Sequence, residues 1–268
     1  MDEVDGVDSP EAAIALENVS KTFPRGEDRV EALKGISLEI RKGKVTGLIG
    51  PAGAGKSSIA RQVATALGFE FLDTGAMYRA ITFGAMRAGV AMEDVDSLVR
   101  LADQVVLGWR GHRIFLNEED ISDEIRTPEV TARIRYLADP PPIRRSLTLQ
   151  QRRIADGRDI VTEGRDQGTE VFPDADCKIF LTASPEERAK RRQQQLAEAG
   201  KEVAFETILA AQNQRDLEDR IREVGRLRAA KDAIVIQTDG MTPAEVLQKV
   251  LTVVSESLSE LAPARTRR

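Results

Sequence analysis

The sequence predicts an α/β fold, in which a mostly parallel sheet carries helices on both of its faces. Three observations predict this class: short apolar runs of strand length recur along the chain, stretches with apolar residues at helical spacing lie between them, and one apolar run leads straight into a glycine-rich loop. Strands that alternate with helices favour parallel pairing, because a parallel connection needs a crossover segment that a helix can supply. With 268 residues, of which 41% are hydrophobic, the chain is long enough to bury such a core.

The central sheet is predicted to have five strands. The first covers residues 45–49 and ends at the glycine-rich loop, and the helix after that loop repeats apolar residues at helical spacing from Ile59 to Leu67 before Gly68 stops it. The other strands are predicted at residues 69–72, 160–163, 178–182 and 233–237. Further helices are predicted at residues 75–87, 143–155, 185–199 and 242–261.

Two antiparallel hairpins are predicted outside this sheet. In the first, apolar residues 14–19 and 32–40 flank a polar turn, and the second of these segments alternates apolar and polar residues as a strand does. The second hairpin is predicted to join residues 105–109 to residues 113–116.

The composition excludes several classes of function. Lys and Arg total 39 against 44 Asp and Glu, a net charge of −5 that argues against general affinity for nucleic acid or anionic membranes, and aromatic residues, at 4%, are too few for base stacking along a groove. The single cysteine, Cys177, and the single histidine, His112, exclude a disulfide framework and cysteine or paired-histidine metal sites. No apolar run approaches the roughly 20 residues of a membrane span. We therefore expect a cytoplasmic protein with no nucleic-acid or membrane partner.

Residues 50–57, Gly-Pro-Ala-Gly-Ala-Gly-Lys-Ser, fit the phosphate-binding pattern G-x-x-x-x-G-K-[ST] between a predicted strand and a predicted helix. Glycines there let backbone N–H groups turn toward phosphate oxygens, and the positive end of the helix dipole adds to the attraction. Lys56 is expected to reach the β- and γ-phosphates of a nucleoside triphosphate, and the Ser57 hydroxyl to ligate Mg²⁺. The residues predicted to bind this nucleotide are Gly50, Pro51, Ala52, Gly53, Ala54, Gly55, Lys56, Ser57 and Ser58.

A phosphate loop does not by itself say how the nucleotide is used. Residues 14–57 resemble the opening of an ABC-type ATPase, with Phe23 at the position where that family stacks an aromatic ring on adenine. The family's Leu-Ser-Gly-Gly-Gln signature, its apolar run ending in Asp-Glu and its late switch histidine are missing after residue 57. An ABC-type ATPase subunit, or a nucleotide-binding protein without a phosphoryl acceptor, is therefore the alternative function.

From about residue 45 to about residue 254 the chain resembles the bacterial-type cytidylate (CMP/dCMP) kinases. Ordered motifs carry this resemblance: Leu72-Asp-Thr-Gly-Ala-Met-Tyr-Arg79, Glu119-Asp-Ile-Ser-Asp-Glu-Ile-Arg-Thr127, Glu163-Gly-Arg-Asp-Gln-Gly-Thr169, Phe172-Pro-Asp-Ala175 and Arg215-Asp-Leu-Glu-Asp-Arg-Ile-Arg222. Each motif is moderately specific, and their order and spacing together make the resemblance strong.

The resemblance implies a P-loop NTPase fold, α/β/α in three layers, whose five parallel strands lie in the order 2-3-1-4-5 by chain position. It implies ATP-dependent phosphorylation of CMP or dCMP to CDP or dCDP by direct in-line transfer with Mg²⁺, and we expect a monomer. The expected organisation starts with a disordered lead-in at residues 1–13 and an ABC-like hairpin at 14–43, followed by a kinase domain at 44–261 and a basic tail at 262–268. Within the kinase domain we expect a monophosphate-binding insert at about 92–156 and a lid at about 188–228.

The arginine distribution supports this reading independently. Phosphoryl transfer to a nucleoside monophosphate joins two anions, and the acceptor phosphate is itself the nucleophile. Catalysis then depends on holding both partners in line and neutralising charge, which planar arginine side chains do well. Arginines are concentrated in residues 144–165 and 188–228. About half of them are expected to be solvated surface residues, with Arg158, Arg220, Arg226 and Arg228 as the candidates.

The resemblance also implies roles for individual residues. The positions that match acceptor-binding residues are Thr74 and Arg79 for the phosphate and sugar, Arg144 and Asp166 for cytosine, Arg165 for the acceptor phosphate, Arg215 on the lid, and Asp219 for the ribose. The residues expected to act in catalysis are Lys56, Arg165, Arg188, Arg192, Arg215 and Arg222.

Further expectations concern the donor side of the site. Arg188 and Arg192 are one helical turn apart, on a face that could reach the donor phosphates as the lid closes, and Arg191 is a weaker candidate. Glu163, at the end of a core strand, could hold a Mg²⁺-bound water near Ser57 or pair instead with Lys56.

The chain departs from the family pattern at several places. Arg135 stands where the family has a serine that contacts cytosine, and Gly225-Arg226 replaces the usual Ala-Pro near the end of the lid. The family normally begins at the strand before the phosphate loop, whereas residues 14–43 precede that strand here. This hairpin either stacks Phe23 on the donor adenine or is a passive cap, or an engineered or recombined addition, with no catalytic role, and the second reading is favoured.

Overall fold

The computed structural model describes residues 12–25, 28–41, 43–110 and 113–260, with residues 12–41 and 259–260 described by their backbone alone. Its centre is a five-stranded parallel sheet in the order β4-β8-β3-β9-β10. The strands are β3 (Val45–Ile49), β4 (Glu70–Asp73), β8 (Ile160–Gly164), β9 (Cys177–Thr182) and β10 (Ile234–Gln237). By chain position this order is 2-3-1-4-5, so the predicted α/β class and strand order are confirmed.

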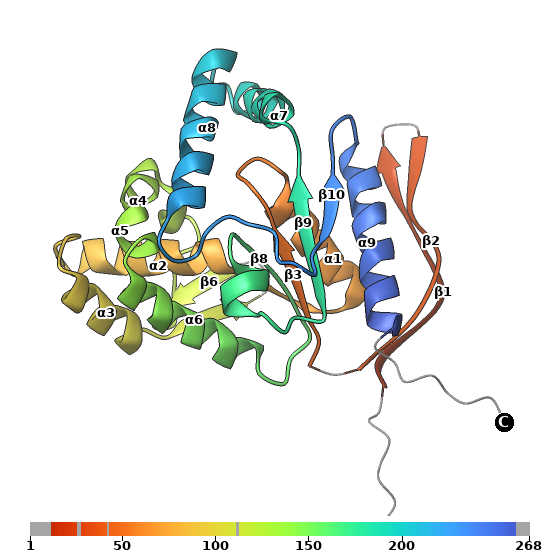
Figure 1. Cartoon of the computed structure of the whole chain (residues 1–268), viewed down its shortest axis with the longest axis horizontal. Coiled ribbons are helices and arrows are strands. Elements are labelled where there is room, and N and C mark those ends of the chain that lie inside the picture. Colours follow the sequence, from red (N-terminus) through yellow and green to blue (C-terminus); the bar gives the residue numbers. More distant parts are fainter. Residues whose placement is uncertain (1–11, 26–27, 42, 111–112, 261–268) are drawn as a thin grey trace, which may run out of the picture.

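Helices α1 (Lys56–Leu67) and α9 (Pro243–Glu260) cover one face of the sheet (Figure 1). Helix α1 follows the glycine-rich loop and ends at Gly68, as predicted, because a left-handed φ of 69° there closes its last turn. The apolar sides of both helices pack against strands β3 and β9 in one buried core that includes Ile59, Val63, Ile179, Val250 and Val254. The predicted end of α9 at residue 261 lies outside the described residues.

Helices α2 (Thr74–Arg87) and α6 (Pro141–Ala155) cover the opposite face, and α3 (Val95–Gln104), which was not predicted, packs against them. A second core, which includes Leu72, Met77, Leu98 and Leu147, joins these helices to the sheet. Helix α6 begins earlier than predicted, because proline is tolerated in a first turn whose N–H groups have no intrahelical acceptor.

The segment between α3 and α6 carries a small antiparallel sheet of its own. The predicted second hairpin is present as β5 (Leu107–Arg110) and β6 (Arg113–Leu116), and the short strand β7 (Glu119–Asp120) adds a third member. The chain then continues through the short helical elements η1 (Glu124–Arg126), α4 (Pro128–Arg133) and α5 (Arg135–Ala138).

Two helices stand over the carboxyl ends of the central strands (Figure 1). Helix α7 (Pro185–Glu198) follows β9 as predicted, with Ser184 as its N-cap. Helix α8 (Phe205–Ile221), within the predicted lid, was not predicted as a helix. The π-helical turn η2 (Gln167–Val171) follows β8 on the way to these elements.

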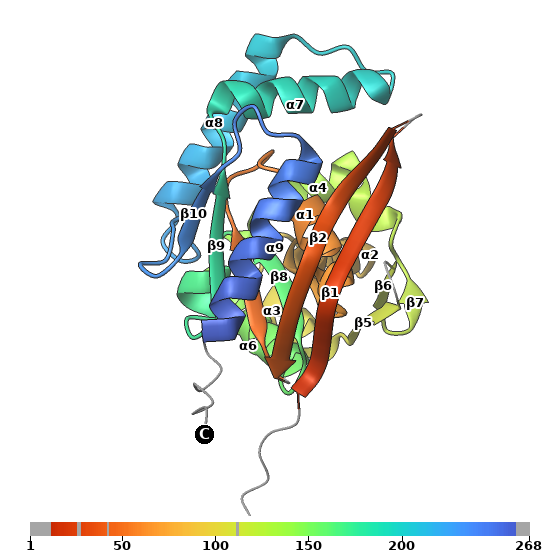
Figure 2. The ribbon, with the colours of Figure 1, turned by 90° about the vertical axis from the view of Figure 1, so that its right-hand side faces the viewer.

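The N-terminal segment forms two antiparallel strands, β1 (Ala12–Arg25) and β2 (Asp28–Arg41), which are longer than predicted. They lie along the outer side of α9 in both views (Figures 1 and 2). Residues 1–11 of the predicted lead-in at 1–13 lie outside the described residues, and residues 12 and 13 begin β1. The tail from residue 262 and the side chain of Phe23 also lie outside the described part. The resemblance of this segment to ABC-type ATPases therefore stays a prediction.

Candidate active site

The phosphate loop connects the end of β3 to the start of α1, as the sequence predicts. Gly55, the N-cap of α1, has a φ of 81°, a left-handed conformation that glycine adopts without strain. Among the described residues, no side chain caps α1, and its first turn contains no acidic residue. The first N–H groups of α1 and the positive end of its dipole are therefore available to an anion.

Lys56 is buried at the base of this loop, with 6% of its surface exposed. Its ammonium group donates a hydrogen bond to the Pro51 carbonyl oxygen at 3.0 Å and lies 3.9 Å from the Glu163 carboxylate. Burial, followed by the charge of Arg165, lowers the pKa of Lys56 to about 7, although Glu163 opposes the shift. A bound phosphate would compensate the positive charge that burial disfavours, so this lysine is suited to an anionic ligand.

Oxygen donors of the kind that Mg²⁺ prefers gather beside Lys56. A methyl group built on Gly75 would lie 3.5 Å from Asp73 Oδ1 and 4.0 Å from Glu163 Oε1, so the two carboxylates face the same space. Burial and the charge of Glu163 raise the pKa of Asp73, which is the expected result when two buried carboxylates lie close together. The exposed Ser57 lies in the first turn of α1, at the same edge of the sheet. This donor set fits a magnesium ion shared with a nucleotide.

A cavity of about 490 Å³ opens beside the phosphate loop, with α2, α5, α8 and the end of β8 among its walls. Most of the predicted acceptor-binding residues line it, namely Thr74, Arg144, Arg165, Asp166, Arg215 and Asp219. Arg222, which was expected to act in catalysis, lines it as well. Tyr78, Arg135 and Glu163 also line it, so Glu163 lies between the cavity and Lys56. The structure thus brings together residues that are far apart in the sequence.

The part of the cavity near Glu163 holds more positive than negative charge. Asp219 accepts from Arg165 at 2.7 Å and pairs with Arg222 at 3.0 Å, and these cations lower its pKa against the opposing effect of burial. Burial and the charge of Arg165 lower the pKa of Arg215 as well. Arg165 and Arg215 both also lower the pKa of Lys56, so these cations lie within electrostatic reach of one another. Such a cluster favours phosphate groups.

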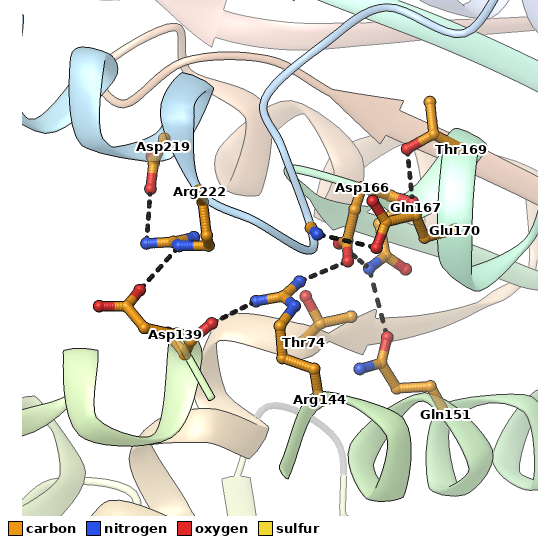
Figure 3. Close-up of polar contacts among 12 residues, drawn as sticks. Thr74, Asp139, Arg144, Gln151, Asp166, Gln167, Thr169, Glu170, Asp219 and Arg222 are labelled. Atoms are coloured by element: carbon orange, nitrogen blue, oxygen red, sulfur yellow. Dashed lines mark hydrogen bonds and ion pairs between the residues drawn. The ribbon is translucent and has the colours of Figure 1, made fainter. Parts of the chain in front are cut away.

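Another part of the cavity holds a buried ion pair between Arg144 and Asp166 (Figure 3). Arg144 Nη2 lies 2.5 Å from Asp166 Oδ2, and Nη1 donates to the Ala138 carbonyl oxygen at 2.7 Å. The Arg144 guanidinium also lies 5.5 Å from the centre of the Tyr78 ring, and burial raises the pKa of Tyr78 so that its hydroxyl stays protonated. A guanidinium donor beside a carboxylate acceptor is complementary to the edge of a nucleobase that carries both a carbonyl and an amine.

Arg79 and Arg192 lie outside the lining of this cavity. Arg79, on α2, donates to the Thr131 hydroxyl at 2.7 Å, and Thr131 is itself a lining residue. Arg192 is exposed on α7 and donates to Gln195 at 3.5 Å, and its neighbour Arg191 donates to the Thr238 carbonyl oxygen at 2.6 Å. Arg79 therefore lies next to a residue of the cavity wall, and neither Arg191 nor Arg192 lines the cavity.

Arg188 lies against the phosphate loop rather than in the acceptor cavity. It donates to the Ala52 carbonyl oxygen at 2.9 Å and to the Ala183 carbonyl oxygen at 3.2 Å. Its remaining terminal nitrogen pairs with Asp216 of α8 at 2.7 Å, and both side chains are buried. Arg188 therefore ties α7, α8 and the phosphate loop together.

Sequence reasoning missed Asp73, Glu170 and Asp216. Asp73 carried a usable signal, because it ends a parallel strand next to the strand that ends near Glu163, and the carboxyl ends of such strands share one edge. Glu170 and Asp216 contact residues that are distant in the chain, Gly225 and Arg188 respectively, so no local pattern marks them.

The fold and its two adjoining anion sites define a P-loop kinase that acts on small molecules. Within that class, the chain belongs to the cytidylate kinase family, whose family model matches residues 47–256. The match covers residues 57–256 of the region in which the motifs of an ABC-type ATPase are missing, so that alternative is not favoured. Strands β1 and β2 lie outside the match.

Curated relatives agree with this assignment. The chain is 71% identical over 213 residues to a cytidylate kinase of Rhodopirellula baltica, covering 80% of this chain and 93% of that protein. It is 42% identical over 208 residues to a cytidylate kinase of Caldanaerobacter subterraneus subsp. tengcongensis, with 78% and 93% covered. It is 43% identical over 209 residues to a cytidylate kinase of Carboxydothermus hydrogenoformans, with 76% and 94% covered.

Proposed function

We propose that the chain transfers the γ-phosphoryl group of ATP to CMP or dCMP, giving ADP and CDP or dCDP, with Mg²⁺ as the metal. The observation that carries the proposal is the position of Glu163, which lies 3.9 Å from Lys56 of the phosphate loop and also lines the acceptor cavity. A donor phosphate on the loop and an acceptor phosphate among the arginines would therefore meet beside it. The names of the relatives support cytidylate as the acceptor.

On the donor side, the N–H groups of the phosphate loop and Lys56 bind the ATP phosphates. Mg²⁺, held near Ser57 and Glu163 with Asp73 beside them, would supply charge neutralisation between the β- and γ-phosphates. Lys56 is protonated when the phosphates are bound, and the Glu163 carboxylate, 3.9 Å away, stabilises the charged ammonium group. These groups orient the γ-phosphoryl group toward the acceptor cavity.

On the acceptor side, the monophosphate is held by Arg165, Arg215 and Arg222. Arg79 donates a hydrogen bond to Thr131 in the wall of the same cavity. An oxygen of that phosphate attacks the γ-phosphorus of ATP in line with the leaving ADP oxygen, so one P–O bond forms as another breaks. The attacking oxygen is already ionised, so no general base is needed. The arginines contribute by position and by neutralising the charge of the transferred group.

The acceptor base is recognised at the Arg144–Asp166 pair. The Arg144 guanidinium donates to the cytosine carbonyl, and the Asp166 carboxylate accepts from its exocyclic amine. Thr74 lies near the acceptor phosphate and Asp219 near the ribose. Uridylate carries a carbonyl in place of that amine, so an acceptor carboxylate disfavours it. Action as a cytoplasmic monomer remains a prediction; within the described residues, no helix is long and apolar enough to cross a membrane.

The test is ADP formation from Mg·ATP alone and in the presence of CMP, dCMP, UMP or AMP, with the diphosphate product identified by chromatography. We expect a rate far above the ATP-only background with CMP and dCMP, and a weaker rate with UMP and AMP. Hydrolysis that is the same with and without acceptor would contradict the proposal and favour a nucleotide-binding protein without an acceptor.

A further inference from the structure

Charged side chains of the insert and of α8 meet at one side of the acceptor cavity (Figure 3). Arg222, which ends α8, donates from Nε to Asp139 Oδ1 at 2.7 Å, and its Nη2 pairs with Asp219 Oδ1 at 3.0 Å. Within the described residues, its remaining terminal nitrogen, Nη1, has no hydrogen-bond or ion-pair partner. Because Arg222 lines the cavity, this nitrogen is available to an acceptor phosphate.

Asp139 belongs to a fixed part of the insert. It follows α5, and its backbone N–H donates to the Arg135 carbonyl oxygen at 3.0 Å. The carbonyl oxygen of the preceding residue, Ala138, accepts from the buried Arg144 at 2.7 Å. The Asp139 carboxylate therefore contacts Arg222 from the same short segment that supports Arg144.

The insert and α8 carry complementary charges with the same spacing. Arg135 and Asp139 are one helical turn apart, and so are Glu218 and Arg222, because the Arg222 N–H donates to the Glu218 carbonyl oxygen at 3.1 Å. Arg135 and Glu218 line the same cavity from α5 and α8. The hydrogen bond to Tyr136, followed by the charges of Asp139 and Glu218, raises the pKa of Arg135, so Glu218 lies within electrostatic reach. A cation on each element is thus placed opposite a carboxylate on the other.

We propose that Asp139 and Arg135 are positioning residues for binding of the acceptor phosphate. Two complementary charge pairs, Asp139–Arg222 and Arg135–Glu218, join the insert to α8 and hold Arg222 with Nη1 directed into the acceptor cavity. This inference rests on the proposed function and deepens it, since Arg222 is one of the arginines that hold the monophosphate there.

Asp139 is suited to this role because, within the described residues, its carboxylate contacts Arg222 alone. Asp219, the other carboxylate on Arg222, is shared with Arg165 at 2.7 Å and, in the proposed function, with the acceptor ribose. Arg135 stands where the family has a serine that contacts cytosine, and the charge pair gives it a role in joining the insert to α8 instead of reading the base.

The first test compares Asp139→Asn with Glu129→Gln in the full chain. Glu129 pairs with Arg133 on α4, so its variant removes the same charge from the insert without touching the cavity wall. Asp139 is 55% exposed, so salt should screen its pair with Arg222. Relative to the unmodified protein at the same salt, we expect Asp139→Asn to raise the KM for CMP about three- to fivefold at about 50 mM salt and less than about twofold at about 0.5 M. The KM for ATP should change less than about twofold, and Glu129→Gln should leave both values near those of the unmodified protein.

The second test exchanges the charges of the other pair. Arg135→Glu places two carboxylates opposite each other and should raise the KM for CMP at least about threefold at low salt. Combining Arg135→Glu with Glu218→Arg makes the pair attractive again and should return that KM to within about twofold of the unmodified value. Two residues that act independently would show no such rescue.

Three results would each overturn the inference while leaving the proposed function intact. They are equal KM values for CMP in Asp139→Asn and Glu129→Gln, an effect of Asp139→Asn that does not change with salt, and a double variant no better than Arg135→Glu alone. Failure of the unmodified protein to phosphorylate CMP would instead overturn the proposed function.

Discussion

The charged form of Lys56 is unfavourable in the free protein and becomes favourable when an anionic nucleotide is bound. Burial and the neighbouring cation Arg165 disfavour its charge, and Glu163 at 3.9 Å only partly restores it. A nucleotide supplies the missing negative charge, so part of the free energy of binding comes from relief of this unfavourable state.

The pH dependence of nucleotide binding should follow from this residue. In the free protein the pKa of Lys56 is lowered from 10.5 to about 7, so at pH 8.5 most of this side chain is the neutral amine. Bound phosphates raise the pKa again, so binding takes up a proton, and affinity should fall by up to about tenfold per pH unit above pH 7. Calorimetry of Mg-free ATP binding at pH 8.5 in two buffers of different protonation enthalpy measures this uptake.

Lys56→Arg provides the control for proton uptake, since a guanidinium keeps its charge over this range. Any affinity that this variant retains should show little proton uptake. Uptake near zero for the unmodified protein, together with the same Kd at pH 7 and pH 9, would show that Lys56 is charged before the nucleotide arrives.

The sequence could predict the site residues that belong to local motifs, but not the contacts that depend on tertiary packing. Thr74, Arg165 and Asp166 each belong to a short motif that ends a strand, and the structure places all of them around one cavity. Arg188 was expected on a face that could reach the donor phosphates, and that role stays a prediction. Its contacts with Ala52 and Asp216 depend on how α8 packs, which no local pattern reports.

Helices α7 and α8 act as one unit over the phosphate loop because they share a buried ion pair. Arg188 of α7 and Asp216 of α8 are 3% and 5% exposed as side chains, and Arg188 also donates to the loop at Ala52. Gln212 of α8 adds a bond to the Arg188 carbonyl oxygen at 3.4 Å. Since α8 also carries Arg215 and Arg222, this contact links the donor loop to the acceptor arginines.

Removing Asp216, the acidic partner of Arg188, should therefore destabilise the folded protein. Asp216→Ala leaves Arg188 buried without its counter-ion, and we expect it to lower the free energy of unfolding by about 3 kcal/mol, as measured by urea denaturation. The matched control is Glu70→Ala, which breaks the exposed pair between Glu70 and Arg158, with side chains 61% and 53% exposed, and should cost less than about 1 kcal/mol. Similar losses for the two variants would mean that the Arg188–Asp216 pair contributes no more than a surface contact.

Helix α8 also shows why one element of the fold escaped sequence analysis. It buries polar residues, Gln212, Asp216 and Asp219, and leaves Leu217 and Ile221 more than half exposed. Its buried side faces the arginines of the site, so the usual apolar periodicity is inverted. By contrast α1, which packs its apolar side on the sheet, was predicted to its last residue. The apolar periodicity of α1 made that helix predictable, whereas the buried polar residues of α8 did not.

At the scale of the whole molecule, both candidate phosphate sites lie at the carboxyl edge of the central sheet, beside the strand β3 that has neighbours on either side. The insert and the α7–α8 unit approach this edge from different parts of the chain (Figure 1). A protein with a net charge of −5 thus concentrates positive charge where two anions meet. Strands β1 and β2 take no part in this arrangement as far as their backbone shows, since they lie along α9 (Figures 1 and 2).

Deletion of residues 1–43 tests whether the N-terminal hairpin serves catalysis. The cut keeps Lys44, whose ammonium pairs with Asp176 at 2.6 Å and whose N–H donates to Asp159 at 3.0 Å, so the start of β3 stays anchored. The family match begins at residue 47. We therefore expect kcat and the KM for ATP to change by less than about twofold, while Tm falls by several degrees because the surface of α9 beside β2 becomes exposed.

Phe23→Ala in the full chain is the matched variant and should leave both kinetic values unchanged. A tenfold rise in the KM for ATP in both proteins would instead mean that Phe23 stacks on the donor adenine, because loss of one base–aromatic contact costs roughly 1–3 kcal/mol.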